Sequence, residues 1–483
     1  MGRRVLGTLI AVTAAAVALL LLTPAGGIAW SNASQAAGLS HQADAGKSLR
    51  GPRGRRGRRG YKGRRGPRGR TGPTGLTGAQ GLQGPTGLKG DKGLQGAIGG
   101  SAVHCSLAKA KPRTYTGAPC GARTRFIDHN GDTGGYSSLA IGADGNPVIS
   151  YADFGNARIM VAHCNDRACA GGDETVKTVD PSAGAGETSL AIGADGNPIV
   201  AYHDTVNHAL KVAHCRDLSC AAADPRFVDS AATADTAGNP SIAIGTDGNP
   251  VIAYYDIDTK NLRIAHCNDP VCAGADEAFK TFTTADDDGT WASLAIGTDG
   301  KPVVSYYDAT SADLAVLHCT AADCSAGSSA TVASVGSVGQ HSALAVGADG
   351  KPVISYTDET NIDPVGYDQK LMVAHCNDVA CADASLNMVA YRPYPGMWSS
   401  IAIGMDGNPV ISHSIGPYYG EQVVFCNDPA CAGQNERAVT FEEIGFGGYF
   451  WSSIAIGTDG VPILSYYPQF LGGLKIARVT GAP

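Results

Sequence analysis

The chain has 483 residues, enough for two or three domains, and is rich in Gly (65 residues) and poor in charge (17% of residues). Its formal net charge of −7 hides a split, because residues 1–100 carry 16 Lys and Arg against two acids and the rest carry 21 against 42. This split excludes a single evenly charged domain, so the basic N-terminal part and the acidic remainder are treated separately.

The N-terminal residues have the pattern of an export signal. An arginine pair precedes residues 5–22, which contain no charge, and small residues offer a cleavage point before Trp30. The apolar run also approaches the length of a membrane span, so residues 1–29 are either a cleaved signal peptide or an uncleaved membrane anchor. In both cases the arginines stay on the cytoplasmic side. We therefore expect a secreted or cell-surface protein with oxidised cysteines, and a linker over residues 30–50.

Every third residue from Gly51 to Gly99 is Gly. Only Gly fits at the crowded axis of three wound polyproline-like chains, so this unbroken period predicts a triple helix over residues 51–99. The segment resembles the collagen-like stalks of bacterial surface proteins. The resemblance implies a homotrimer with a rod of roughly 150 Å. A disordered Gly-rich linker, which needs no such period, is the alternative.

Basic residues are concentrated in the first triplets of this segment. Trimerisation triples their charge, and such a block repels itself unless an anion neutralises it. We therefore predict contact with an envelope polyanion or an anionic membrane. The candidate contact residues are Arg53, Arg55, Arg56, Arg58, Arg59, Arg64 and Arg65. The alternative is that these arginines only solubilise the rod. Sequence-specific nucleic-acid recognition is not expected, because no reading helix or base-stacking sheet accompanies the block.

One phrase recurs seven times in the acidic part of the chain. Its first copy, residues 138–151, reads Ser-Leu-Ala-Ile-Gly-Ala-Asp-Gly-Asn-Pro-Val-Ile-Ser-Tyr. The first Leu or Ile of the phrase recurs every 50–57 residues, at Leu139, Leu190, Ile242, Leu294, Leu344, Ile401 and Ile454. Each unit predicts two short apolar strands around an Asp-Gly turn, followed by a third and a fourth strand. Four short strands per unit indicate the blade of a β-propeller, and a β-solenoid is the alternative.

The two ends of the repeat region complement each other. The last unit has only three strands, and Thr124–Asp128 supplies a lone fourth strand before the first unit. One blade built from both ends closes the ring and leaves no free sheet edge. The expected fold is therefore all-β, a seven-bladed β-propeller over residues 101–483. It is preceded by the collagen-like triple-helical segment and the N-terminal signal or anchor segment.

The fourteen cysteines fall into seven pairs. Six pairs are Cys-x4-Cys at the turn between the third and fourth strands, and Cys105 and Cys120 precede the closing strand in the same way. One disulfide is expected in each blade. The six regular pairs are Cys164 with Cys169, Cys215 with Cys220, Cys267 with Cys272, Cys319 with Cys324, Cys376 with Cys381, and Cys426 with Cys431.

A metal site is the alternative for these cysteines, because a His precedes the first Cys of five pairs. Neighbouring side chains in a strand point to opposite faces, so the His and the Cys do not converge on one ion. We therefore expect no metal and no cofactor.

Positions that differ between the blades are the better candidates for ligand contact. Three residues before each repeated Leu or Ile stand Tyr136, Glu187, Asn239, Trp291, His341, Trp398 and Trp451. Most of these are aromatic, and aromatic side chains on a rigid scaffold suit the C–H faces of sugar rings. The candidate residues for binding a glycan or a protein are Tyr136, Trp291, His341, Trp398, Trp451, Tyr394, Tyr419 and Tyr449. The alternative is that these rings pack between the blades as core.

A Tyr-x-Asp motif follows the second strand in five blades. Its aspartates are Asp153, Asp204, Asp256, Asp308 and Asp358. One interpretation is a ring of acids for a cation or for ligand hydroxyls. The other is that each Asp starts a turn, which is the commoner role of this residue.

No motif of a known catalytic type stands out. A nucleophile elbow, a zinc-binding His-Glu motif, a sialidase-type box and a single-blade carboxylate pair are all missing, so an enzyme is not expected. We expect an extracellular or cell-surface structural or adhesive protein, whose stalk displays a head that binds glycan or protein. The alternatives are a purely structural matrix or envelope component without ligand, and a secreted propeller hydrolase or lyase.

Overall fold

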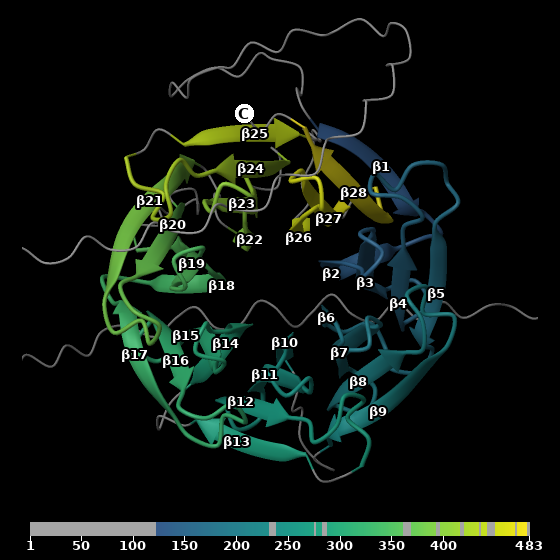
Figure 1. The fold of residues 1–483 in the computed structure, drawn as a ribbon, viewed down its shortest axis with the longest axis horizontal. Coiled ribbons are helices and arrows are strands. Elements are labelled where there is room, and N and C mark those ends of the chain that lie inside the picture. Colours follow the sequence, from purple (N-terminus) through teal and green to yellow (C-terminus); the bar gives the residue numbers. More distant parts are fainter. Residues whose placement is uncertain are drawn as a thin grey trace, which may run out of the picture. The chain divides into compact units, whose positions relative to one another are not determined.

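The computed structural model describes residues 122–230, 238–274, 277–282, 287–360, 369–392, 397–415, 420–433, 436–441, 450–468 and 471–480. In this part of the chain seven four-stranded antiparallel sheets stand in a ring (Figure 1). The expected all-β, seven-bladed propeller is therefore confirmed. Nothing in the same residues forms a helix that is long and apolar enough to cross a membrane.

The four strands of each sheet follow one another from the axis of the ring outward (Figure 1). The inner strands are β2 (Thr133–Ile141), β6 (Thr188–Ile192), β10 (Gly238–Ile244), β14 (Asp288–Ile296), β18 (Val338–Val346), β22 (Met397–Ile403) and β26 (Phe450–Ile456). The second strands are β3 (Pro147–Asp153), β7 (Pro198–Asp204), β11 (Pro250–Asp256), β15 (Pro302–Asp308), β19 (Pro352–Asp358), β23 (Pro409–Ser414) and β27 (Pro462–Pro468).

The outer half of each sheet is formed by the third and fourth strands. The third strands are β4 (Arg158–His163), β8 (Ala209–Cys215), β12 (Asn261–His266), β16 (Asp313–Cys319), β20 (Gln369–Cys376), β24 (Glu421–Phe425) and β28 (Leu474–Val479). The outermost strands are β5 (Thr175–Asp180), β9 (Ala223–Asp229), β13 (Ala278–Phe282), β17 (Gly327–Ala333), β21 (Ala384–Arg392), β25 (Arg437–Phe441) and β1 (Ala122–Asp128).

The Asp-Gly phrase forms the turn between the first two strands of each blade. In the first blade Asp144 Oδ1 accepts the backbone N–H of Asn146 at 3.0 Å, and Gly142 N donates to the carbonyl of Asn146 at 2.8 Å. Gly145 has a φ of +81°, a conformation that Gly adopts without steric cost. The short hairpin holds the inner strand against the second strand.

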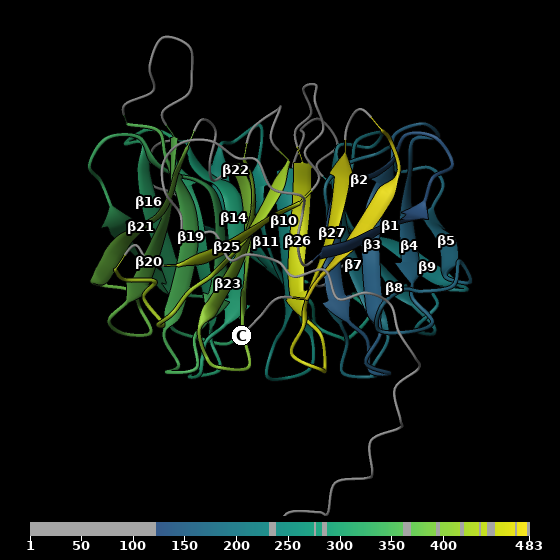
Figure 2. The same cartoon turned by 90° about the horizontal axis from the view of Figure 1, so that it is seen from above.

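The hydrophobic core lies between neighbouring sheets rather than inside one sheet. Val148 and Val161 of the first blade pack in one cluster with Leu190 and Val200 of the second, and these valines are fully buried. Figure 2 shows the sheets side by side around the ring. Burying apolar area on both faces of each sheet holds adjacent blades together.

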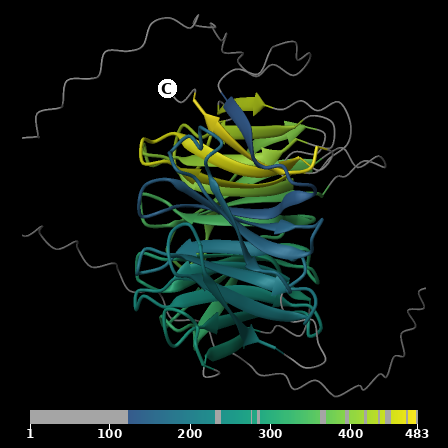
Figure 3. The same cartoon turned by 90° about the vertical axis from the view of Figure 1, so that its right-hand side faces the viewer.

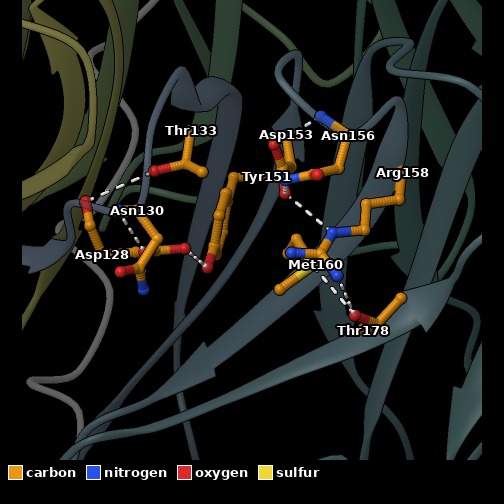
Figure 4. Close-up of polar contacts among 9 residues, drawn as sticks. All are labelled: Asp128, Asn130, Thr133, Tyr151, Asp153, Asn156, Arg158, Met160 and Thr178. Carbon is orange, nitrogen blue, oxygen red and sulfur yellow. Dashed lines mark hydrogen bonds and ion pairs between the residues drawn. The ribbon is translucent and has the colours of Figure 1, made fainter.

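In the first three blades the tyrosine of the Tyr-x-Asp motif ties two blades together, through Tyr151–Asp128, Tyr202–Asp180 and Tyr254–Asp229. The Tyr151 hydroxyl donates to Asp128 Oδ2 at 2.8 Å, so the tyrosine of the first blade reaches back to the outermost strand of the seventh (Figure 4). Asp153 accepts the backbone N–H of Asn156 at 3.0 Å and pairs with Arg158 at 2.7 Å. The aspartate of the motif therefore starts a turn, and it does not join a ring of free acids.

The seventh blade is built from both ends of the described chain. Strand β1 pairs with β28 from Ala122↔Val479 to Asp128↔Leu474. The dark blue β1 lies beside the yellow strands in Figures 1 and 3. The core continues across the closure, since Leu139 of the first blade packs with Ile463 of the last.

The six regular cysteine pairs are disulfides, as expected, and their side chains are buried in the clusters between the blades. Cys164 is bonded to Cys169, Cys215 to Cys220, Cys267 to Cys272, Cys319 to Cys324, Cys376 to Cys381, and Cys426 to Cys431.

The second cysteine of each regular pair does not have the extended backbone conformation of a strand residue. These six residues have a φ between 48° and 53°, in the left-handed region that favours Gly, which the spacing of the cysteines did not predict. They are Cys169, Cys220, Cys272, Cys324, Cys381 and Cys431. The physical reason is a tight turn: in the first blade Cys169 N donates to the carbonyl of Asp166 at 3.1 Å, and the disulfide holds the turn closed.

Several segments and residues that the sequence singled out lie outside the described residues. They are the signal or anchor segment, the linker, the collagen-like segment with its seven candidate arginines, and the pair of Cys105 and Cys120.

Candidate functional site

The seven residues that stand three positions before the repeated Leu or Ile line one cavity at the axis of the ring. We call them the channel ring. Its members are Tyr136, Glu187, Asn239, Trp291, His341, Trp398 and Trp451. The cavity has a volume of about 190 Å³, and the residue that follows each member also lines it. Because the inner strands surround the axis (Figure 1), the folding of seven separate blades brings these seven side chains together.

Five members of the channel ring have an unusual backbone conformation. The φ angles of Tyr136, Asn239, Trp291, His341 and Trp398 lie between 49° and 52°. At each of these positions the inner strand holds one extra residue, which makes a β-bulge. In the first blade Gly135 pairs with Ala152 and Ser138 pairs with Ser150, so two residues of β2 lie opposite one residue of β3. Such a bulge re-aims a side chain, and a positive φ is costly for a bulky residue.

Aromatic members from five successive blades form a continuous arc. We call it the aromatic arc: Trp291, His341, Trp398, Trp451 and Tyr136. In that order the ring centroids are separated by 4.6, 5.1, 5.7 and 4.7 Å. Neighbouring rings are tilted against each other, which is the arrangement that aromatic quadrupoles favour.

Further aromatic side chains support the arc from behind. Tyr467 stacks on Trp451 with centroids 5.8 Å apart, and Phe154 contacts Tyr136 edge-on at 5.6 Å. His341 is buried, and the other four members of the arc are half-buried. The arc therefore packs between blades and also borders the cavity.

The remaining two blades give the cavity a polar side. Glu187 and Asn239 occupy the channel ring there. Glu187 Oε2 lies 3.1 Å from Nδ1 of the buried His203, which holds the carboxylate in place, and the Glu187 side chain keeps 29% of its surface exposed. Among the described residues that line the cavity, Glu187 is the single carboxylate, and neither Lys nor Arg is present.

Burial changes the acid–base properties of two members of the arc. It lowers the pKa of His341 to about 4, so the imidazole is neutral at neutral pH. The ring nitrogen Nδ1 of this side chain is buried and has no hydrogen-bond partner in the described residues. Burial, followed by the charge of Glu187, raises the pKa of Tyr136 to about 12.

Hydroxyl groups behind the channel ring join neighbouring blades. Ser342 Oγ lies 3.0 Å from Ser305 Oγ of the preceding blade and also donates to the carbonyl of Trp291 at 3.0 Å. Equivalent pairs join four further interfaces: Ser150 and Thr188, Ser355 and Ser399, Ser412 and Ser452, and Ser465 and Ser137. At the other two interfaces apolar residues take these positions, Ala201 with Pro240 and Ala253 with Ala292.

The histidines that precede the cysteines have a structural role at the opposite ends of the inner strands. Their Nε2 atoms lie 2.9–3.1 Å from the turn aspartates of the same blade. The pairs are His163–Asp144, His214–Asp195, His266–Asp247, His318–Asp299 and His375–Asp349. No group of three or more His, Cys, Asp or Glu in the described ranges is placed to hold a metal ion.

The structure brings five of the eight candidate ligand residues together, namely the aromatic arc. The other three, Tyr394, Tyr419 and Tyr449, lie outside the described residues. The selection of aromatic side chains alone passed over Glu187 and Asn239, although they occupy the same position in their repeats. Equivalence of position was thus the better signal for this site than residue type.

Comparison with known proteins gives one family match. Residues 45–104 match the family model described as Collagen triple helix repeat. This bears out the resemblance to collagen-like stalks, and the match spans the segment in which Gly recurs at every third position. No match was found among curated proteins.

The chain is similar to several solved structures. One is a protein of unknown function from Dyadobacter fermentans, with 11% identity, a TM-score of 0.43, and coverage of 75% of this chain and 98% of that one. An α-L-arabinanase from Penicillium chrysogenum, complexed with arabinobiose, has 13% identity and a TM-score of 0.42, and the match covers 61% of this chain and 92% of that one. An α-L-arabinofuranosidase from Fusarium graminearum has 13% identity and a TM-score of 0.41, and the match covers 61% of this chain and 92% of that one.

These matches correct one expectation. The sequence analysis expected the chain not to be an enzyme, on the ground that catalytic motifs were missing. Two of the three solved structures named above are glycoside hydrolases, which contradicts that expectation, since propellers assemble sites from scattered strands and loops without a linear motif. At these identities the similarity concerns the fold alone.

Proposed function

We propose that this chain is an extracellular protein whose propeller head binds a glycan in the cavity at its axis. The observation that carries the proposal is the aromatic arc, five rings from five successive blades that border a single cavity. Flat apolar rings pack against the C–H faces of sugars, and a few polar groups fix orientation. Glu187 and Asn239 are such groups, and they stand on the side of the cavity that the arc leaves open.

The backbone of the channel ring supports this proposal. Trp291, His341 and Trp398 keep a positive φ that costs about 1–3 kcal/mol per residue. Residues held in such conformations cluster at ligand sites, because the surrounding structure must impose them. If these side chains only filled a hydrophobic core, residues in ordinary strand conformation would be sufficient. Trp451 in β26 has this ordinary conformation.

The proposal places the head on a trimeric stalk outside the cell. The collagen repeat match supports a triple helix over residues 51–99, and a triple helix contains three chains. Disulfides in the blades fit an oxidising compartment, reached through the N-terminal signal or anchor of residues 1–29. Three heads on one stalk raise avidity for a polymeric glycan. The arginine block would hold the stalk to an envelope polyanion or an anionic membrane.

Glycan binding by the full chain tests the proposal. The chain is screened on a glycan array, and the best ligand is titrated by calorimetry. We expect the double variant Trp398→Ala/Trp451→Ala to bind about thirtyfold more weakly, because buried aromatic anchors carry most of the energy of such contacts.

The matched control is Phe227→Ala, which removes an aromatic side chain that is 46% exposed on the outermost strand β9. This variant should bind as the parent does. The proposal is wrong if no glycan on the array binds, or if the double variant binds as tightly as the control.

A further inference from the structure

We infer that the sugar bound in the cavity carries an amine in its protonated, ammonium form, so that the head selects amine-bearing glycans over neutral and acidic ones. The inference rests on the proposed function and specifies its ligand. Its starting point is the charge of the wall, which has one carboxylate and no Lys or Arg among its described residues.

The carboxylate of Glu187 is fixed and acts on the cavity. His203 holds Oε2 at 3.1 Å, so the side chain does not have to be ordered when a ligand arrives. Its charge reaches the next member of the ring, because it contributes to the raised pKa of Tyr136. An ammonium group placed between Glu187 and the arc gains a charge-assisted contact that a neutral sugar lacks.

The aromatic arc favours a cation for the same electrostatic reason. Aromatic faces carry negative potential and attract ammonium groups, and Trp does so more strongly than Tyr or Phe. Three of the five members of the arc are Trp. Arc and carboxylate therefore act in the same direction from opposite sides of the cavity.

The side chain of His341 in the cavity wall is uncharged. A protonated imidazole in this wall would repel an ammonium group, but burial keeps this side chain neutral at neutral pH. A neutral imidazole has one nitrogen that accepts a hydrogen bond. Nδ1 is buried, lacks a partner in the described residues and belongs to a side chain that lines the cavity. Because Nδ1 is shielded from the cavity, what this side chain contributes to the wall is the absence of a positive charge that would repel the ammonium group.

The same wall disfavours acidic sugars. A uronic acid would bring a second carboxylate beside Glu187, and the described residues of the wall include neither Lys nor Arg to compensate the repulsion. We therefore expect the order of affinity to be amine-bearing, then N-acetylated, then acidic.

The test compares three oligosaccharides of equal length, titrated into the full chain by calorimetry at a mildly acidic pH at which the sugar amine is protonated and His341 is still neutral. They are β-1,4-linked glucosamine, its N-acetylated form and a uronic acid oligomer. We expect glucosamine to bind about tenfold more tightly than the N-acetylated form, as befits one charge-assisted contact. In Glu187→Gln, which keeps the shape of the side chain and removes its charge, the ratio of the two dissociation constants should fall toward one.

Asp173→Asn is the matched control, since it removes one charge from an exposed residue in the loop between β4 and β5. It should keep the tenfold ratio. Equal binding of glucosamine and its N-acetylated form, preference for the acidic oligomer, or an unchanged ratio in Glu187→Gln overturns the inference and leaves glycan binding intact. Absence of binding to all three oligosaccharides also overturns the inference, whereas the proposed function falls only if no glycan on the array binds.

Discussion

Some large side chains of the channel ring stand at positions with a positive φ, a backbone conformation that is unfavourable for bulky residues. Trp291 and Trp398 have the positive φ that is normally left to Gly or Asn, and Asn239 is the one member of a type that tolerates it well. This conformation goes with the bulge of the inner strand, since Asn239 has it outside the arc and Trp451, in a regular register, lacks it inside the arc. Within the arc each ring also touches a ring of the next blade. The identity of each residue is therefore coupled to that of its neighbours.

His341 should make stability depend on pH. Its folded-state pKa of about 4 lies below the ordinary value of about 6.5, so the unfolded chain takes up a proton that the folded chain does not. The free energy of unfolding should then fall as the pH decreases through this window, by about 3 kcal/mol in total from this group.

Urea unfolding at several pH values between about 7 and about 4 measures this effect. In His341→Gln the free energy of unfolding should fall less steeply with decreasing pH than in the parent, by up to about 1.4 kcal/mol per pH unit. Parallel curves for the two proteins over this range would contradict the assignment.

At the scale of the strand, bulged and regular inner strands should respond oppositely to the same substitution. Trp398 lies at a bulge with a φ of 49°, whereas Trp451 pairs with Tyr467 in a regular register and is not among the residues with positive φ. At position 398 Gly relieves strain that Ala keeps, so Trp398→Gly should be more stable than Trp398→Ala by about 1 kcal/mol.

At position 451 the order should reverse. Gly in a regular strand costs about 0.5–1 kcal/mol relative to Ala, so Trp451→Gly should be the less stable variant of its pair. Urea unfolding of the four variants gives both differences, and each pair loses the same indole, so the loss of the ring cancels. The same sign at both positions would show that the bulge does not control the backbone.

The blades could be predicted from sequence because their signals are local and repeated. Asp144-Gly145 marks a turn, the spacing of Cys164 and Cys169 marks a staple, and each recurs in other blades. The bulges and the positive φ of Cys169 could not be predicted, because a Trp, His or Cys in a sequence does not indicate this conformation. The place of Glu187 in the cavity wall could not be predicted for a different reason: this carboxylate meets the aromatic side chains of other blades only after the ring has closed.

On the scale of the whole head, the ring is not seven-fold symmetric in its chemistry. Hydroxyl pairs such as Ser305 and Ser342 occupy five interfaces, and the two interfaces with Ala or Pro flank the third blade, which supplies Asn239. A buried hydroxyl needs a partner, so both members of a pair are present or both are replaced. All four interfaces between members of the aromatic arc thus carry a hydroxyl pair, whereas the two interfaces that lack one lie on either side of Asn239.

The collagen-like segment should determine how many chains, and therefore how many heads, one molecule contains. If residues 51–99 form a triple helix, the full chain should have three times the mass of one chain by light scattering, and a variant that lacks these residues should have the mass of one. Gly81→Ala should lower the melting temperature of the trimer, because Ala does not fit at the axis of three chains. Thr77→Ala, in the same segment but off the axis, is its control and should change little. A single-chain mass for the full protein, or a trimer that survives the deletion, would contradict a stalk-driven assembly and leave each head to bind alone.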